Sequence, residues 1–203
     1  MAAVRLHRLM SEYEGRVRVV EKPFPLEVFG SGGPDRGLLE QEWWIAAIQE
    51  PLAEFNPYEG DDFPETTLPA FEAAWCAFQQ GEDAGHDYDL RVRRAFFAQG
   101  RNIGRREVLL EIAEEAGLEM SRFERDFSGD EPRRAVLAEA REGVERYRVR
   151  GTPTVMLPSG KKLRHPIAFP RMEDHRVGGC GLFPAAARGV LRRRGRSSRR
   201  PRR

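Results

Sequence analysis

The spacing of hydrophobic side chains changes from helical to extended near the start of the chain. An apolar stripe predicts a helix over residues 4–13, which Gly15 can end in a left-handed conformation. Apolar residues then alternate over residues 16–21, which predicts a strand that Pro23 stops. Residues 29–37 are rich in glycine and form a predicted loop. The chain is therefore expected to begin with a helix, a strand and a linker.

A helical period then continues from Leu38 for roughly a hundred residues, which is typical of an all-helical unit rather than of alternating strands and helices. Apolar stripes predict helices over residues 39–52, 67–78, 91–99, 105–116 and 131–147. Ser121 and Glu124 have the spacing of a capping box for a short helix that reaches Phe127. Asp130 and Pro132 can open the last and longest helix.

Extended structure returns after residue 150. Residues 154–157 form a predicted strand, residues 158–161 have turn chemistry, and residues 162–165 can return antiparallel to complete a hairpin. Beyond residue 170 the pattern becomes irregular, with a short predicted helix over residues 184–191. No internal repeat is apparent.

Composition predicts a soluble globular chain with an acidic body and a basic end. Of its 203 residues 40% are hydrophobic and 33% charged, and no apolar run is long enough to cross a bilayer. Residues 187–203 contain nine arginines and no acidic residue, which leaves 25 basic and 32 acidic residues in the rest. Any attraction to polyanions is therefore expected from the tail. The first ten residues lack the features of a secretory signal, so the expected location is the cytoplasm.

Cysteine and histidine positions do not indicate a metal site or a redox motif. Cys76 and Cys180 are too far apart for a Cys-x-x-Cys motif, and Cys76 follows a tryptophan on an apolar helix, where a thiol is usually a packed core group. Cys180 lies between glycines and is expected to be more accessible. We predict no metal and no bound cofactor, since the histidines are scattered: they are His7, His86, His165 and His175.

Aromatic side chains at helical spacing admit two interpretations. Phe71, Trp75 and Phe78 share one face of a predicted helix, and Phe96 and Phe97 are adjacent on another. Such groups can line a ligand cleft between helices. They are more often core, and core packing is our prediction here.

The order of elements and the run Gly151-Thr152-Pro153-Thr154 resemble the DsbA-like thioredoxin family, which includes FrnE-type proteins and 2-hydroxychromene-2-carboxylate isomerases. The phrase from Phe96 to Ile103 adds to the resemblance, which spans about residues 6–165. It implies an α/β fold with a thioredoxin-like core (residues 1–37 and 129–170), an inserted helical domain (residues 38–128) and an irregular basic tail (residues 171–203).

The resemblance also implies a central strand and a redox motif before the first helix, and this chain starts inside that helix. The N-terminal strand is thus missing from the expected sheet, and no catalytic residue can be assigned. A start upstream of Met1 is our preferred explanation; a chain that obtains the strand from a partner or rearranges its sheet is the alternative. In the latter case unpaired strands predict association or aggregation.

Thr152 and Pro153 are the predicted substrate-binding residues. In the family a cis-proline at this place faces the active site, so the resemblance implies that an extended peptide or thiol substrate lies beside it. The complete protein would then be a thiol-disulfide oxidoreductase or a glutathione-using isomerase. The other hypothesis is a non-catalytic protein that holds a peptide or small molecule on the same surface.

Overall fold

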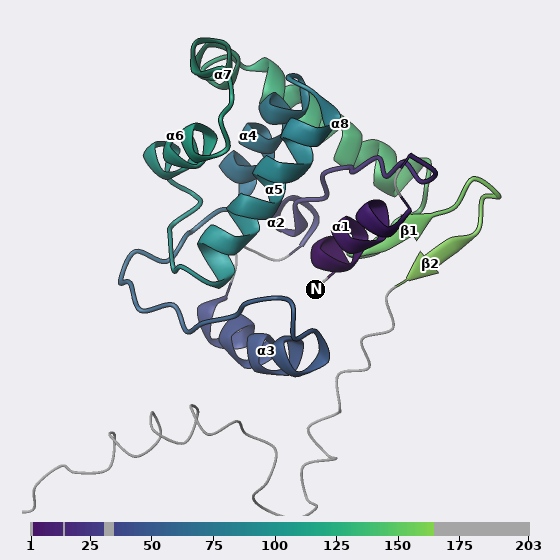
Figure 1. Cartoon of the computed structure of the whole chain (residues 1–203), viewed down its shortest axis with the longest axis horizontal. Coiled ribbons are helices and arrows are strands. Elements are labelled where there is room, and N and C mark those ends of the chain that lie inside the picture. Colours follow the sequence, from purple (N-terminus) through teal and green to yellow (C-terminus); the bar gives the residue numbers. More distant parts are fainter. Residues whose placement is uncertain (1, 14, 31–34, 165–203) are drawn as a thin grey trace, which may run out of the picture. The chain divides into compact units, whose positions relative to one another are not determined.

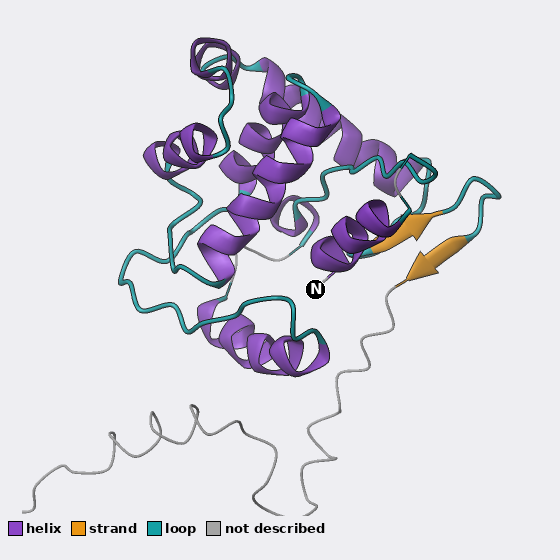
Figure 2. Cartoon of the chain, in the orientation of Figure 1, coloured by secondary structure: helices purple, strands orange, loops and turns teal. Residues whose placement is uncertain are grey.

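The computed structural model describes residues 2–13, 15–30 and 35–164 (Figure 1). Within these residues there are eight helices followed by one two-stranded sheet (Figure 2). In chain order the elements are α1 (Ala2–Glu12), α2 (Leu26–Phe29), α3 (Arg36–Gln49), α4 (Leu68–Phe78), α5 (Glu82–Phe97), α6 (Arg106–Glu115), α7 (Met120–Phe127), α8 (Glu131–Glu145), β1 (Thr154–Met156) and β2 (Lys162–Arg164).

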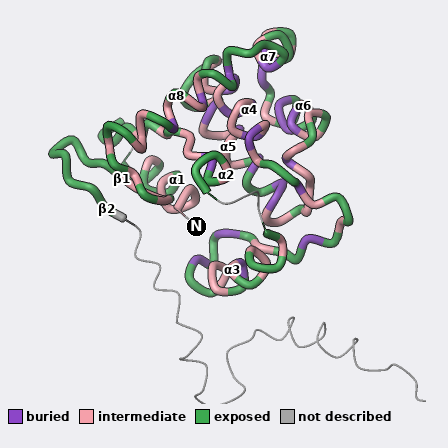
Figure 3. The backbone as a smooth tube through the Cα atoms, turned by 180° about the vertical axis from the view of Figure 1, so that it is seen from behind, coloured by how far each residue is buried: buried purple, intermediate pink, exposed green. Residues whose placement is uncertain are grey.

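The main core is built around α4, which packs against α5, α6, α7 and α8. Small residues on α4, including Ala73 and Ala77, are fully buried and let the neighbouring helices approach closely. Large side chains from the surrounding helices fill the space between them, and Figure 3 shows the buried positions concentrated there. The largest of these side chains are Tyr88, Leu109, Ile112, Phe123 and Val136.

Acidic side chains lie at the N-termini of α4 and α7, and at α7 the cap is not the residue expected. Glu119 caps α7 by accepting a hydrogen bond from the Arg122 N–H at 2.9 Å, so the predicted capping box at Ser121 is wrong. For α4, the Glu27 carboxylate accepts from the Thr67 N–H at 3.1 Å. A carboxylate suits this place because a helix N-terminus has unpaired N–H groups and a partial positive charge.

Helix α5 begins nine residues earlier than its apolar stripe predicts, at Glu82 rather than residue 91. Gly81 separates it from α4 with φ of 141°, a conformation that favours glycine. The early part of α5 is polar on its outer side, where Asp87 pairs with Arg91 at 2.7 Å. Acidic side chains in the first turn and such i,i+4 pairs stabilise a helix without an apolar stripe.

The strand predicted over residues 16–21 is wrong, because this segment has no strand partner among the described residues and begins in a turn. A strand needs a neighbour to receive its backbone hydrogen bonds, and alternating side chains do not supply one. Side chains hold the segment instead. Arg18 pairs with Glu82, and Lys22 pairs with Glu139 of α8 at 2.5 Å.

Strands β1 and β2 form the predicted hairpin, with Val155 opposite Leu163. Gly160 in the turn has φ of 79°, and its N–H donates to the Leu157 carbonyl at 2.8 Å. Apolar side chains on the hairpin remain exposed, Leu163 by 42%. Within the described residues, no other strand covers either edge of this sheet.

Several expectations lie outside the described residues. They are the short helix over residues 184–191, the accessibility of Cys180 and the polyanion contact of residues 187–203. In the described part of the chain, no helix is long and apolar enough to cross a membrane.

Candidate functional site

The loop that carries the two predicted site residues joins α8 to β1. The turn after α8 is closed by a hydrogen bond from the Val149 N–H to the Gly143 carbonyl at 2.9 Å. The Thr152–Pro153 peptide bond is cis. The Thr154 hydroxyl donates to the Gly151 carbonyl at 2.7 Å, which ties the end of the loop to its beginning. Thr152 and Pro153 are therefore held together in a short, internally bonded loop.

Thr152 is exposed and has unused backbone groups. Neither its N–H nor its carbonyl has a hydrogen-bond partner among residues 2–13, 15–30 and 35–164. Pro153 and Thr154 beside it are partly buried. An N–H and a carbonyl that are not paired within the protein can pair with an extended peptide, as strands pair with one another.

Cys76 is a core residue, as predicted. Its side chain is fully buried on α4, and burial raises the pKa of its thiol to about 12. The nearby charges of Asp126 and Glu72 act in the same direction. Because the thiolate is the nucleophile in disulfide chemistry, Cys76 is unsuited to that role. Among the described residues, Cys76 is the one cysteine.

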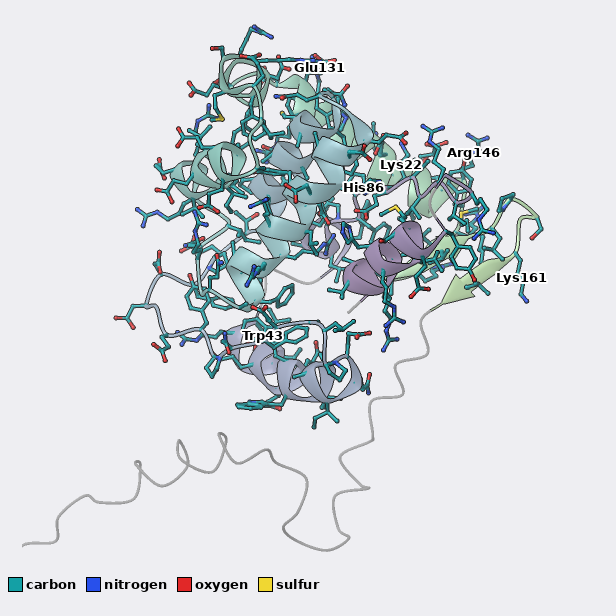
Figure 4. All side chains as sticks on the ribbon, in the orientation of Figure 1. Lys22, Trp43, His86, Glu131, Arg146 and Lys161 are labelled. Atoms are coloured by element: carbon teal, nitrogen blue, oxygen red, sulfur yellow. The ribbon has the colours of Figure 1, made fainter. Side chains whose placement is uncertain are left out.

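A polar cluster that the sequence did not predict lies where residues 19–23 face α5. His86 Nδ1 is 3.6 Å from the Glu21 carboxylate, and Asp89 pairs with Arg93 at 2.6 Å (Figure 4 labels His86). Burial, followed by the charge of Asp89, raises the pKa of the Glu21 carboxyl. Helical spacing links Asp89 to Arg93, but nothing in the sequence places Glu21 beside them.

The predicted core stripe of α4 borders the same region. Phe71, Trp75 and Phe78 are only partly buried and line a cavity next to Glu21. Trp75 still packs against the core cluster, as predicted, but alanines of α4 occupy most of the buried face. Phe96, by contrast, is buried as predicted. No group of three or more metal-ligating side chains occurs within the described residues.

A comparison of sequences shows similarity to one curated protein. Over 89 residues the chain is 37% identical to the uncharacterized protein YwbO of Bacillus subtilis (strain 168), a match that covers 41% of this chain and 42% of that protein. The chain thus matches less than half the length of this relative.

Solved structures resemble the chain over a longer range. Cytosolic disulfide reductase DsbM from Pseudomonas aeruginosa with GSH is 22% identical, with a TM-score of 0.63 over 94% of this chain and 92% of that one. A putative protein disulfide isomerase from Nitrosomonas europaea is 20% identical, with a TM-score of 0.62 over 79% of each chain. These likenesses confirm the predicted fold. Residues 1–172 match the model of the DSBA-like thioredoxin domain, and the chain therefore belongs to that family.

Proposed function

We propose that this chain serves thiol-disulfide chemistry by holding an extended peptide or thiol substrate on the loop containing Thr152 and Pro153. The observation that carries the proposal is the exposure of Thr152, whose N–H and carbonyl have no hydrogen-bond partner among the described residues, on a loop fixed by the bond between Thr154 and Gly151. Membership of the DSBA-like family and the disulfide reductase among its structural neighbours support this chemistry. That neighbour is described as cytosolic, which supports a cytoplasmic location.

The chemical step needs a thiolate next to the bound substrate. The thiolate attacks one sulfur of a disulfide, a new S–S bond forms as the old one breaks, and the displaced sulfur leaves as a thiolate. The attacking thiol is thereby oxidised and the substrate reduced. Thr152 would align the substrate for this exchange, whereas Cys76 is too deeply buried to attack it.

The substrate-binding role is tested with a peptide that cannot undergo exchange. S-carboxymethylated insulin B chain should perturb the amide signals of Thr152 and Thr154 in a nitrogen-15 correlation spectrum. Thr152→Pro removes the free N–H and should weaken binding about two- to tenfold, the effect of one net hydrogen bond. Ser159→Pro is the matched control, because it also removes an N–H and also creates two consecutive prolines, at the hairpin turn. Equal binding by both variants would contradict the proposal.

A second candidate is a binding protein without redox activity, which the burial of Cys76 favours. On this hypothesis the chain does not accelerate the reduction of insulin by dithiothreitol, and the variant carrying Cys76→Ser and Cys180→Ser behaves identically. Acceleration by the unsubstituted chain that the double variant loses would refute the second candidate and assign a working thiol to the chain.

A further inference from the structure

A cavity of about 240 Å³ lies between residues 19–23 and the facing sides of α4 and α5. One wall consists of Phe71, Trp75 and Phe78, three aromatic side chains at helical spacing on α4. Ligand sites commonly combine such an apolar wall with a few polar groups, and this volume is slightly below their usual range of about 300–1,000 Å³. The cavity therefore suits a small molecule with an apolar body.

The remaining wall is polar and carries excess negative charge. Four carboxylates and two basic side chains line the cavity. Most of these acids have a basic partner: Glu139 pairs with Lys22 at 2.5 Å and Asp89 with Arg93 at 2.6 Å, while Glu82 pairs with Arg18. Glu21 differs from these acids: His86 lies 3.6 Å from it, and the charge of Arg93, which pairs with Asp89, acts on it from farther away. An anionic ligand would be repelled here, whereas a cation would be attracted.

His86 has an unfilled hydrogen-bonding position at the same place. Its side chain is only 11% exposed, and Nδ1 is enclosed without a hydrogen-bond partner in the described structure. A separation of 3.6 Å from the Glu21 oxygen is too long for a hydrogen bond. Because Nδ1 is enclosed, a ligand in the cavity meets the Glu21 carboxylate rather than this nitrogen.

We propose that this cavity binds a small organic amine. Its ammonium group donates a charge-assisted hydrogen bond to the Glu21 carboxylate. The apolar body of the amine packs on the aromatic wall, where Trp75 offers the most favourable ring face for a cation. The cavity shares no residue with the loop from Gly151 to Thr154, so the proposal is independent of the proposed thiol-disulfide function.

The test is calorimetric titration of the whole chain with 2-phenylethylamine. Its uncharged analogue 2-phenylethanol and the anion 3-phenylpropanoate serve as ligand controls. Saturable binding of the amine is expected, with the alcohol at least about tenfold weaker, because hydrogen bonds to a charged group are lost. Glu21→Gln should weaken amine binding by a similar factor. Glu59→Gln, at an exposed position away from the cavity, should leave it unchanged.

A second variant keeps the test decisive if Glu21→Gln unfolds. Trp75→Leu retains an apolar wall and should weaken the amine more than the alcohol, since only the cation gains from the indole face. Circular dichroism establishes that each variant is folded. The proposal is overturned if the amine does not bind saturably at millimolar concentration, if the alcohol or the anion binds equally well, or if folded Glu21→Gln binds the amine like the unsubstituted chain.

Discussion

Replacing Leu109 by alanine should lower the free energy of unfolding by about 2–5 kcal/mol, the usual cost of removing a buried leucine side chain. Leu109 is fully buried on α6, a helix that packs against α4, α5 and α7. Its carbonyl also accepts a hydrogen bond from the buried Tyr88 hydroxyl at 3.0 Å, which limits how far α6 can move to fill the space. Urea denaturation followed by circular dichroism measures the loss.

The control for Leu109→Ala is the same substitution at Leu52, whose side chain is 60% exposed. Exposed substitutions usually change the free energy of unfolding by no more than about 0.5 kcal/mol. Similar losses for the two variants would show that α6 is not part of the packed core.

Replacing Trp43 by alanine should cost about 3–5 kcal/mol, as is typical for a buried tryptophan, and should detach α3 before the rest of the chain unfolds. The Trp43 ring packs edge-on against Phe96 and Phe97, with centroids 5.4 Å away in both cases. The opposite side of α3 is exposed, including Ile48. Hydrogen exchange should therefore show lost protection of the α3 amides while those of α5 remain protected.

Trp44→Ala is the matched control, because Trp44 adjoins Trp43 on α3 but is 41% exposed. It should leave the protection of α3 nearly unchanged. Trp43→Phe is a milder variant, since it keeps an aromatic ring and removes the Nε1 donor, which is buried without a partner in the described structure. Equal effects of the two alanine variants would contradict the assignment of Trp43 as the anchor of α3.

Local signals in the sequence account for most of the fold. Helices α4, α6 and α8 lie where apolar residues recur at helical spacing, and Gly117, with φ of 70°, follows the end of α6. Local signals alone do not predict whether residues 16–21 form a strand. Alternation of side chains is a property of the segment itself, whereas a strand exists only when another segment receives its hydrogen bonds.

The candidate site was predictable only where it is continuous in sequence. Thr152 and Pro153 belong to one short motif that resembles a known family, so the sequence alone indicates both. Glu21 and His86 are 65 residues apart and meet only because residues 19–23 cross the face of α5. Their types are common on protein surfaces, and no spacing rule connects them. Contacts between distant segments need the tertiary structure.

The packing of α8 on α4 determines when the helical core can be completed during synthesis. Helices α4 to α7 contact one another and leave the ribosome first, whereas α8 contributes Val136 and Ala140, both fully buried, only after residue 140 has been added. Domains with mostly local contacts fold quickly once their parts are present. Until α8 emerges, the face of α4 that it later covers stays open to water, and nascent chains with such faces are the ones that chaperones protect from aggregation.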